Sequence, residues 1–358
     1  MKRIRRVLAV GAVNLLVLVA LAVPVELIFG DWLGGGELAM LNVRPNTLDV
    51  EASPLYPPGT KITFSRDKYG FRAGAGEPSR IDVLAIGGST TNERLLDDAD
   101  LWTARLQRAL AERGCALTIA NAGVDGYSTV GHIVSFSRWF DRVPGLHPRH
   151  LLVYVGINDA LLSPGQENPG DSQQFKSRWR RLEHYVAAHS ALRRVYVTIR
   201  GWWAARRGGV LRGELPINPE TAWEPTQLPP GFAAAAAAKA AVYRRRLERL
   251  DGLVRQFGAT PIYITQARVD GRIVDGEWRQ IVGSHGAEDT ADLLAINQAT
   301  LGFCRDTGET CVDLAGEIRF APGDFYDAVH NTLAGSERIA RFLAPALVPI
   351  LCRPPLDK

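Results

Sequence analysis

The chain has 358 residues, of which 46% are hydrophobic and 22% charged. These proportions are typical of a globular protein and exclude a disordered or fibrous one. The formal net charge of +4 is matched by four cations near the N-terminus, Lys2, Arg3, Arg5 and Arg6. The rest of the chain is electrically balanced, which argues against nucleic acid as its main partner.

The segment 7–29 follows these cations and is apolar apart from Asn14 and Glu26. As a helix it is long enough to cross the hydrocarbon layer of about 30 Å, so residues 1–29 are expected to form a signal anchor with one transmembrane helix. The basic flank should stay in the cytoplasm and place the body outside, in the periplasm or at the cell surface. A cleaved signal peptide is the alternative, because residues 20–22 read Ala-Leu-Ala, like a cleavage site.

Residues 30–80 are rich in Gly, Pro and other turn formers. Within them, the stretches 62–64 and 69–72 are expected to pair as a small β-hairpin. The whole segment is interpreted as a connector that packs on the main domain.

From residue 81 to the C-terminus, apolar strands alternate with helices. The expected strands are residues 81–86, 117–120, 151–155, 261–265 and 311–314. The expected helices are residues 101–113, 130–140, 233–257, 293–304 and 338–351. This order predicts one α/β domain over residues 81–358, with a parallel sheet covered on both faces. In such sheets, ligands bind beyond the carboxyl ends of the strands.

Residues 161–232 interrupt the alternation and are too long for an ordinary loop, so they are interpreted as an insert. The part 175–207 mixes arginines with five aromatic residues: Trp179, Tyr185, Tyr196, Trp202 and Trp203. Three interpretations stay open. The segment is an amphipathic piece on the membrane surface, an aromatic lid over the substrate, or a solvated helix pair packed on the core.

The four cysteines form no Cys-x-x-Cys pair, which argues against a zinc ribbon or a redox motif. Cys304 and Cys311 fall at the expected end of one helix and the start of the next strand, where a disulfide would fit. Cys115 with Cys352 is a less specific pairing. An oxidising compartment would permit both, and four free buried thiols are the alternative.

The first strand runs into Gly87, Gly88 and Ser89, where two glycines let the backbone turn sharply. Ser89 would then begin a helix, with its hydroxyl over the sheet edge and amides able to face an oxyanion. Gly126 follows the second strand and offers its backbone amide, and Asn158 follows the third strand and offers its side-chain NH₂ group. Both groups can donate a hydrogen bond to a developing negative charge. Taken singly, these residues are equally well a helix cap, a positive-φ glycine and a loop cap.

A further pair stands near the C-terminus, where His330 comes three residues after Asp327. A histidine is the usual base for a serine nucleophile, and a carboxylate usually orients it. Asp327 alone would be interpreted as a helix N-cap. Together with Ser89, Gly126 and Asn158, however, the pair completes the parts needed for acyl transfer: a nucleophile, a base, an orienting group and an oxyanion hole.

These short blocks, in this order, resemble the SGNH/GDSL hydrolase superfamily. Gly87-Gly88-Ser89 stands for the first block of the superfamily, Gly-Asp-Ser, and Gly126 for the glycine of the second block. Residues 156–159 match the third block, Gly-x-Asn-Asp, and residues 327–330 match the fifth, Asp-x-x-His. The resemblance covers residues 81–351 apart from much of the insert.

The resemblance implies a flavodoxin-like three-layer αβα sandwich with a five-stranded parallel sheet. It also implies that Ser89, His330 and Asp327 are catalytic, that the amides of Ser89 and Gly126 and the side chain of Asn158 form the oxyanion hole, and that no metal or other cofactor takes part. One residue departs from the pattern. Gly88 replaces the usual Asp, which is not a member of the triad, so only the local hydrogen bonding of the turn is in doubt.

The expected function is that of an extracytoplasmic serine esterase that removes O-acetyl groups from a polysaccharide or cell-wall glycan. An anchored, outward-facing member with a Gly-Gly-Ser-Thr first block resembles those that handle such sugars. An O-acetyltransferase, a lipase-type ester hydrolase and an inactive glycan-binding subunit are the alternatives. The expected partners are an acylated glycan or another ester, and the membrane through the N-terminal helix.

Overall fold

The computed structural model divides the chain into two compact units. The first comprises Met1–Met40 and Gln174–Arg212, and the second comprises Leu41–Gln173 and Gly213–Lys358. The structure describes residues 2–30, 32, 38, 41–162, 179, 182, 185–186, 189–193, 195–196 and 221–352.

The core of the second unit is a five-stranded parallel sheet in the order β10-β7-β5-β3-β4, as the sequence predicts. Its strands in chain order are β3 (Val83–Gly87), β4 (Ile119–Gly123), β5 (His150–Tyr154), β7 (Thr260–Ile264) and β10 (Thr310–Val312). Every residue of β3 is buried, because helices cover both faces of the sheet.

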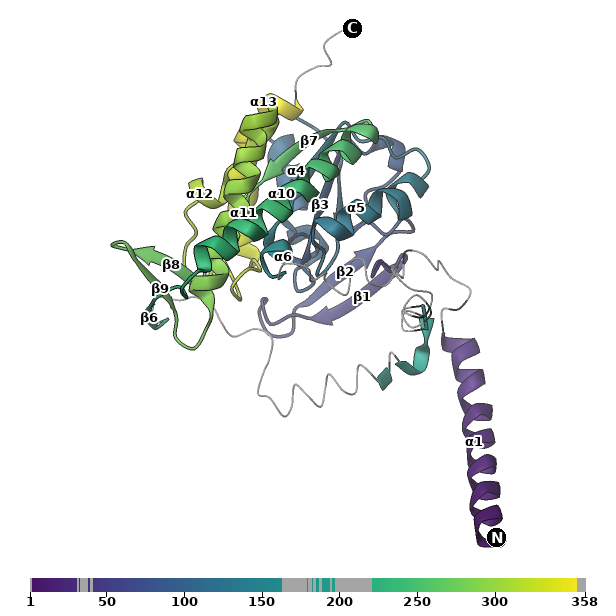
Figure 1. Ribbon diagram of the computed structural model, residues 1–358. Helices are drawn as coiled ribbons and strands as arrows, with labels where there is room; N and C mark the ends of the chain where they lie inside the picture. The colour runs from purple at the N-terminus through teal and green to yellow at the C-terminus, as the bar shows by residue number, and fades with distance from the viewer. Residues whose placement is uncertain are drawn as a thin grey trace. The chain divides into compact units, whose positions relative to one another are not determined.

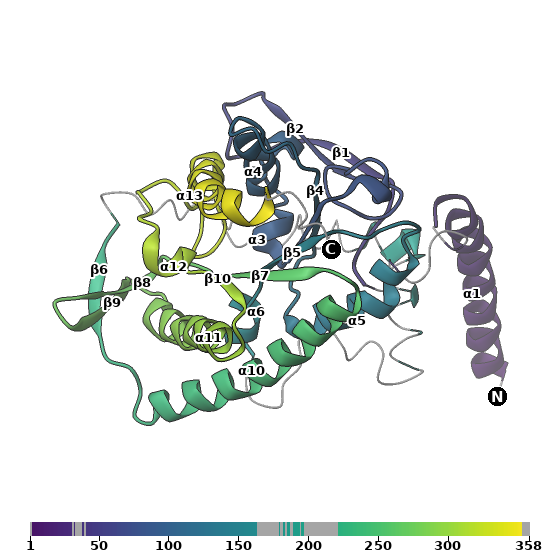
Figure 2. The same cartoon turned by 90° about the horizontal axis from the view of Figure 1, so that it is seen from above.

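Five long helices cover the sheet (Figure 1): α4 (Trp102–Ala111), α5 (Thr129–Arg138), α10 (Phe232–Gln256), α11 (Gly286–Thr307) and α13 (Leu333–Leu351). Figure 2 shows α4 and α13 on one side of the sheet and α5, α10 and α11 on the other. The predicted α/β architecture with a five-stranded parallel sheet is therefore confirmed. Helices α11 and α13 begin earlier than the apolar spacing predicts, since their first turns are rich in small and polar residues.

Short elements follow the strands at the carboxyl edge or connect the larger ones. They are η1 (Pro78–Arg80), α3 (Ser89–Asn92), η2 (Asp98–Asp100), η3 (Phe140–Arg142), α6 (Ile157–Ala160) and α12 (Leu314–Glu317). Trp102 of α4 is fully buried and donates its indole N–H to the carbonyl oxygen of Thr90 at 3.1 Å. The packing of α4 therefore fixes the position of the short helix α3.

The connector pairs differently from the expectation. Strand β2 (Lys61–Arg66) pairs antiparallel with β1 (Thr47–Ala52), whereas residues 69–72 contribute only isolated bridges at Arg72. The physical reason is a turn held by Asp67, whose carboxylate accepts hydrogen bonds from the amides of Tyr69 and Phe71, each at 2.9 Å.

A second, three-stranded antiparallel sheet was not predicted. It has the order β6-β9-β8, with β6 (Trp223–Thr226), β8 (Gly271–Val274) and β9 (Glu277–Ile281). Figure 1 shows its strands together beside one end of α10 and α11. Strand β6 lies within the predicted insert 161–232, most of which falls outside the described residues.

In the first unit, helix α1 spans Lys2–Phe29. Within the described part of the chain, however, no helix combines the length and the apolar character needed to cross a membrane. The expected transmembrane helix is therefore not supported. Near the end of α1, the carboxylate of Glu26 accepts hydrogen bonds from the hydroxyl of Ser190 at 2.6 Å and the amide of Ala191 at 2.9 Å.

The aromatic part of the insert, residues 175–207, lies largely outside the described residues, including Trp202 and Trp203. Of its described residues, Trp179 and Tyr196 are exposed. The ring of Tyr185 stacks on His189 with 4.1 Å between the ring centroids.

All four cysteines are in disulfides. The bond Cys304–Cys311 joins the C-terminal part of α11 to β10, and Cys115–Cys352 joins the segment after α4 to the end of α13. The second bond links elements 237 residues apart in the sequence.

Candidate active site

The candidate site begins at the turn between β3 and α3. A side chain at Gly87 would place a Cβ 2.1 Å from the hydroxyl of Thr91 and 2.7 Å from the carbonyl oxygen of Tyr154, so only glycine fits there. The turn allows Ser89 to open α3 as its first residue, with a side chain that is partly exposed at the carboxyl edge of the sheet. This is the position that the sequence predicts for a nucleophile.

The loop before α13 places His330 and Asp327 next to Ser89. The Nε2 atom of His330 lies 2.7 Å from Ser89 Oγ, and its Nδ1 lies 2.7 Å from an oxygen of Asp327. An ionised carboxylate only accepts hydrogen bonds, so Nδ1 carries the proton and Nε2 accepts from the Ser89 hydroxyl. The three residues thus form one continuous chain of hydrogen bonds.

The backbone of this loop also holds Asp327. Its second carboxylate oxygen accepts hydrogen bonds from the amides of Val329 at 2.9 Å and His330 at 2.8 Å. The ring of Tyr326 stacks on the imidazole of His330 with 5.5 Å between centroids. These contacts fix both the carboxylate and the imidazole plane before a substrate binds.

Asp327 and His330 each shift the pKa of the other. Burial would raise the pKa of Asp327, but the hydrogen bond and positive charge of His330 lower it below its ordinary value. Burial would lower the pKa of His330, but the hydrogen bond and charge of Asp327, with the charges of Glu93 and Asp125, raise it. The arrangement therefore favours an imidazolium beside a carboxylate, which is the ion pair formed when His330 accepts a proton.

Asn158 lies in the short helix α6, which follows β5. Its Nδ2 donates a hydrogen bond to the carbonyl oxygen of Tyr127 at 2.8 Å. A Cβ on Gly88 would lie only 2.5 Å from the same Nδ2 atom. The glycine that departs from the Gly-Asp-Ser pattern therefore leaves the space that the amide of Asn158 occupies.

The turn that carries Gly126 is connected to α3 through Asn92. Gly126 has a φ of 76°, which explains a glycine there. Asn92 donates from Nδ2 to Asp125 at 2.8 Å and accepts from the guanidinium of Arg66 at 2.7 Å. Arg66 is itself buried and donates to the carbonyl oxygen of Gly123 at 2.7 Å. The second block is thereby held against the helix that begins with Ser89.

Two residues of the site carried no sequence signal. Gln266 follows β7, donates to the hydroxyl of Thr90 at 3.0 Å and accepts from the amide of Ile157 at 2.7 Å, so it connects the first and third blocks. Glu93 directly follows α3 and is buried. Neither belongs to a motif, and the burial of an isolated Glu or Gln is not visible in a sequence without its partners.

Asp159 has a supporting position. Its buried carboxylate accepts from the amide of Thr129 at 2.9 Å and from the Thr129 hydroxyl at 2.7 Å. It joins the start of α5 to α6, which carries Asn158. Within the described ranges, no group of three or more His, Cys, Asp or Glu side chains is arranged to hold a metal ion.

Comparison with known proteins agrees with this geometry. Residues 85–338 match the model of the GDSL-like Lipase/Acylhydrolase family. No curated protein matches the chain significantly.

Several solved structures are similar at low identity. The crystal structure of TesA is 15% identical, with a TM-score of 0.43 over 75% of this chain and 98% of that one. An acetyl xylan esterase, AlAXEase, is 13% identical, with a TM-score of 0.42 over 75% and 100%. A catalytic mutant of Axe2, an acetylxylan esterase from Geobacillus stearothermophilus, is 14% identical, with a TM-score of 0.41 over 80% and 98%.

The family match spans most of the chain and includes the turn at Ser89, the amide of Asn158 and the pair Asp327–His330. It also spans all five strands of the parallel sheet except the first two residues of β3. The chain belongs to the GDSL-like lipase/acylhydrolase family and is a serine ester hydrolase.

Proposed function

We propose that Ser89 is the nucleophile of this hydrolase, His330 its general base and acid, and Asp327 the group that orients the imidazole. The hydrogen-bond chain from Ser89 Oγ through His330 to Asp327 carries this proposal. Ser89 attacks the ester carbonyl carbon while its proton passes to His330 Nε2. The C–O bond to the alcohol then breaks, and His330 returns the proton to the departing oxygen.

Water completes the reaction. It loses a proton to His330 and attacks the acyl group on Ser89, which releases the acid and the free serine. The negative charge on the carbonyl oxygen is stabilised by the amides of Ser89 and Gly126 and by Nδ2 of Asn158. The position of Asn158 beside Gly88 supports its part in this group. The loss of one such donor typically lowers the rate by about 10²–10³-fold.

The proposed substrate is an O-acetylated polysaccharide or cell-wall glycan outside the cytoplasm. Export is supported by the pairing of all four cysteines in disulfides, which persist in oxidising compartments. The cluster of Lys2, Arg3, Arg5 and Arg6 before an apolar segment supports it as well. We propose an acetyl group because an O-acetylated sugar carries the ester that the reaction requires. An exported ester hydrolase would encounter such a substrate.

Acetate release from an O-acetylated polysaccharide tests the substrate. We expect the wild-type protein to release acetate and the Ser89→Ala variant to release none above background. Hydrolysis of p-nitrophenyl esters should decline as the acyl chain lengthens from acetate. A preference for long chains would indicate a lipase, and a strong rate increase on adding an oligosaccharide acceptor would indicate an acyltransferase. Either result contradicts the proposed acetylesterase.

Export is tested separately with a thiol-reactive maleimide. Protein isolated from its native host without reductant, then denatured and treated with the reagent, should gain no mass. Labelling of all four cysteines would contradict an oxidising location, and addition of reductant before labelling provides the positive control.

A further inference from the structure

Glu93 is a buried carboxylate directly behind the nucleophile. It ends α3 in the left-handed conformation, with a φ of 43°, and only 1% of the residue is exposed. Its amide donates to the carbonyl oxygen of Ser89 at 2.8 Å. A glutamate needs specific partners to tolerate this degree of burial.

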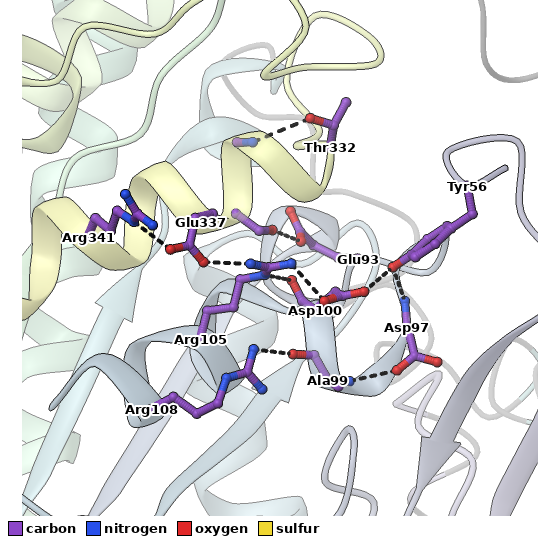
Figure 3. A network of polar contacts seen from close by, with 12 residues as sticks. Tyr56, Glu93, Asp97, Ala99, Asp100, Arg105, Arg108, Thr332, Glu337 and Arg341 are labelled. Atoms are coloured by element: carbon purple, nitrogen blue, oxygen red, sulfur yellow. Dashed lines mark hydrogen bonds and ion pairs between the residues drawn. The ribbon is translucent and has the colours of Figure 1, made fainter. Parts of the chain in front are cut away.

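Those partners come from the segment that carries the histidine. One oxygen of Glu93 accepts from Nδ2 of Asn331 at 2.8 Å, and the other accepts from the hydroxyl of Ser336 at 2.9 Å. Asn331 is the residue after His330, and Ser336 lies in the first turn of α13. Figure 3 shows Glu93 beside the first turn of α13, the helix that carries Glu337. One side chain therefore joins the end of α3 to both ends of the segment that follows His330.

The charged and titratable groups around Glu93 come from four elements. They are His330 before α13, Arg72 after β2, Tyr154 at the end of β5 and, facing His330, Asp125 after β4. Arg72 is fully buried, but its guanidinium pairs with Asp98 and donates to the carbonyl oxygens of Asn92 and Leu96. The guanidinium of Arg72 is thus directed to other partners, and the two side chains that donate to the Glu93 carboxylate, those of Asn331 and Ser336, are neutral.

Burial raises the pKa of Glu93 to about 7, although the hydrogen bonds from Ser336 and Asn331 and the charge of His330 lower it. In turn, the charge of Glu93 contributes to the raised pKa of His330, after the larger contribution of Asp327. The two groups thus stabilise each other in their charged forms.

We propose that Glu93 is a positioning residue for the Ser89–His330 pair. It fixes the segment that carries His330 against the helix that begins with Ser89, and its negative charge stabilises the imidazolium formed when His330 accepts the serine proton. This inference rests on the proposed roles of Ser89 and His330. Glu93 touches no reacting atom and acts only through His330 and its neighbours.

The structure permits a variant that removes the charge and keeps the contacts. In Glu93→Gln, the new amide oxygen can accept from Ser336. The Oδ1 atom of Asn331 is buried without a hydrogen-bond partner, so rotation of that amide lets it accept from the new NH₂ group. Conversely, Ser336→Ala removes one contact and keeps the carboxylate.

The experiment compares kcat, KM and the pH profile of ester hydrolysis in these variants. We expect Glu93→Gln to lower kcat by roughly tenfold with little change in KM, which corresponds to the loss of about one pKa unit of imidazolium stabilisation. Its acidic limb should move to lower pH, because His330 then loses its proton more easily. In Ser336→Ala, the carboxylate stays but loses a hydrogen bond that lowers its pKa, so kcat should fall and the acidic limb should move to lower pH by less than in Glu93→Gln.

Glu337→Gln is the matched control. This carboxylate is the neighbour of Ser336 on α13, accepts hydrogen bonds from Arg105 and Arg341, and has no contact with His330. Its kcat and pH profile should equal those of the wild type. A Glu93→Gln variant that behaves like this control would overturn the proposal, and so would a lower kcat with an unmoved acidic limb.

Two further variants separate the possible failures. If Glu93→Gln does not fold, Glu93→Asp takes its place. This variant keeps the charge, but its side chain is too short to reach both partners. An unchanged kcat in both Glu93→Asp and Ser336→Ala would overturn the positioning role. Ser89→Ala is measured in parallel. Activity retained in Ser89→Ala contradicts the proposed nucleophile, whereas an inactive Ser89→Ala beside a normal Glu93→Gln contradicts only the role of Glu93.

Discussion

The polar residues around Ser89 form two layers with different surroundings. In the outer layer, the side chains of His330 and Asp327 are 22% and 39% exposed, and Asn158 is also partly exposed. In the inner layer, Glu93 and Asn331 are each 1% exposed, behind the serine and away from solvent. The outer groups are able to meet a substrate, whereas the inner groups can affect the reaction only through the outer ones, by holding them in place and by their charge.

The difference shows how a site with four short motifs is made precise. Asn158 belongs to one loop and the pair His330 and Asp327 to another, so their positions relative to Ser89 depend on contacts between loops. The inner layer provides them, through Glu93 to the histidine segment and through Asn92 to the turn of Gly126. Catalytic rates depend steeply on such alignment, because small displacements of reacting groups are costly.

The largest effect is expected from breaking the outer layer. His330→Ala removes the base and should lower kcat/KM by about 10⁴-fold. In Asp327→Asn, an NH₂ group facing Nδ1 would favour the tautomer with its proton on Nε2, which cannot accept from Ser89, so a loss of similar order is expected. Steady-state hydrolysis of p-nitrophenyl acetate measures both. Rates within tenfold of the wild type would show that this hydrogen-bond chain does not carry the reaction.

The next largest effect is expected at Gly88, which precedes Ser89 and lies against the side chain of Asn158. Gly88→Ala adds a Cβ at 2.5 Å from Asn158 Nδ2, so the amide must move. We expect kcat to fall by about 10²-fold, as for the loss of one oxyanion donor, with a smaller change in KM. The Gly88→Asp variant, which restores the usual family residue, should not recover the activity.

Gly252→Ala is the control for this substitution. Gly252 lies in α10, and a Cβ there would meet no atom within 4 Å. Its activity should be unchanged, and its stability equal or slightly higher, because alanine reduces the freedom of the unfolded chain. Equal activity of Gly88→Ala and Gly252→Ala would contradict the explanation given for Gly88.

The smallest effect is a pH-dependent change in stability from the inner layer. Because the folded-state pKa of Glu93 is raised to about 7 from 4.5, its contribution to folding is most favourable below about pH 4.5 and is lost as the pH rises through about 7. Glutamine does not ionise. The Tm of Glu93→Gln minus that of the wild type should therefore increase from pH 5.5 to pH 8.5, as measured by thermal unfolding. A Tm difference that does not change with pH would contradict the raised folded-state pKa of Glu93.

The sequence predicted most of the catalytic unit because its signals are local. Continuous apolar runs such as β3 and β5 indicate buried strands, and the residues directly after them belong to the site. Ser89, Gly126 and Asn158 were named from such positions, whereas Asp327 and His330 were named from their spacing of three residues. The structure brings Ser89, His330 and Asp327 into hydrogen-bond contact and places Asn158 beside them.

What the sequence did not predict depends on distant partners. Glu93 is bonded to residues 238 and 243 positions away, so its burial has no local signature. The reason for Gly88 is the side chain of Asn158, on another loop. Strand β6 pairs with β9, which lies about 50 residues later in the chain, so no local sequence pattern indicates that the two strands form a sheet. A local signal did exist for part of that sheet, since Asp275 and Gly276 have φ angles of 53° and 83° and make a two-residue hairpin turn.

The central claim, that Ser89 is the nucleophile, is tested most directly by covalent labelling with a fluorophosphonate and mass spectrometry of the digested protein. We predict a single label, on the peptide that contains Ser89, with labelling that becomes much slower in His330→Ala and is absent in Ser89→Ala. A label on another residue, or equal labelling of wild type and Ser89→Ala, would contradict the account.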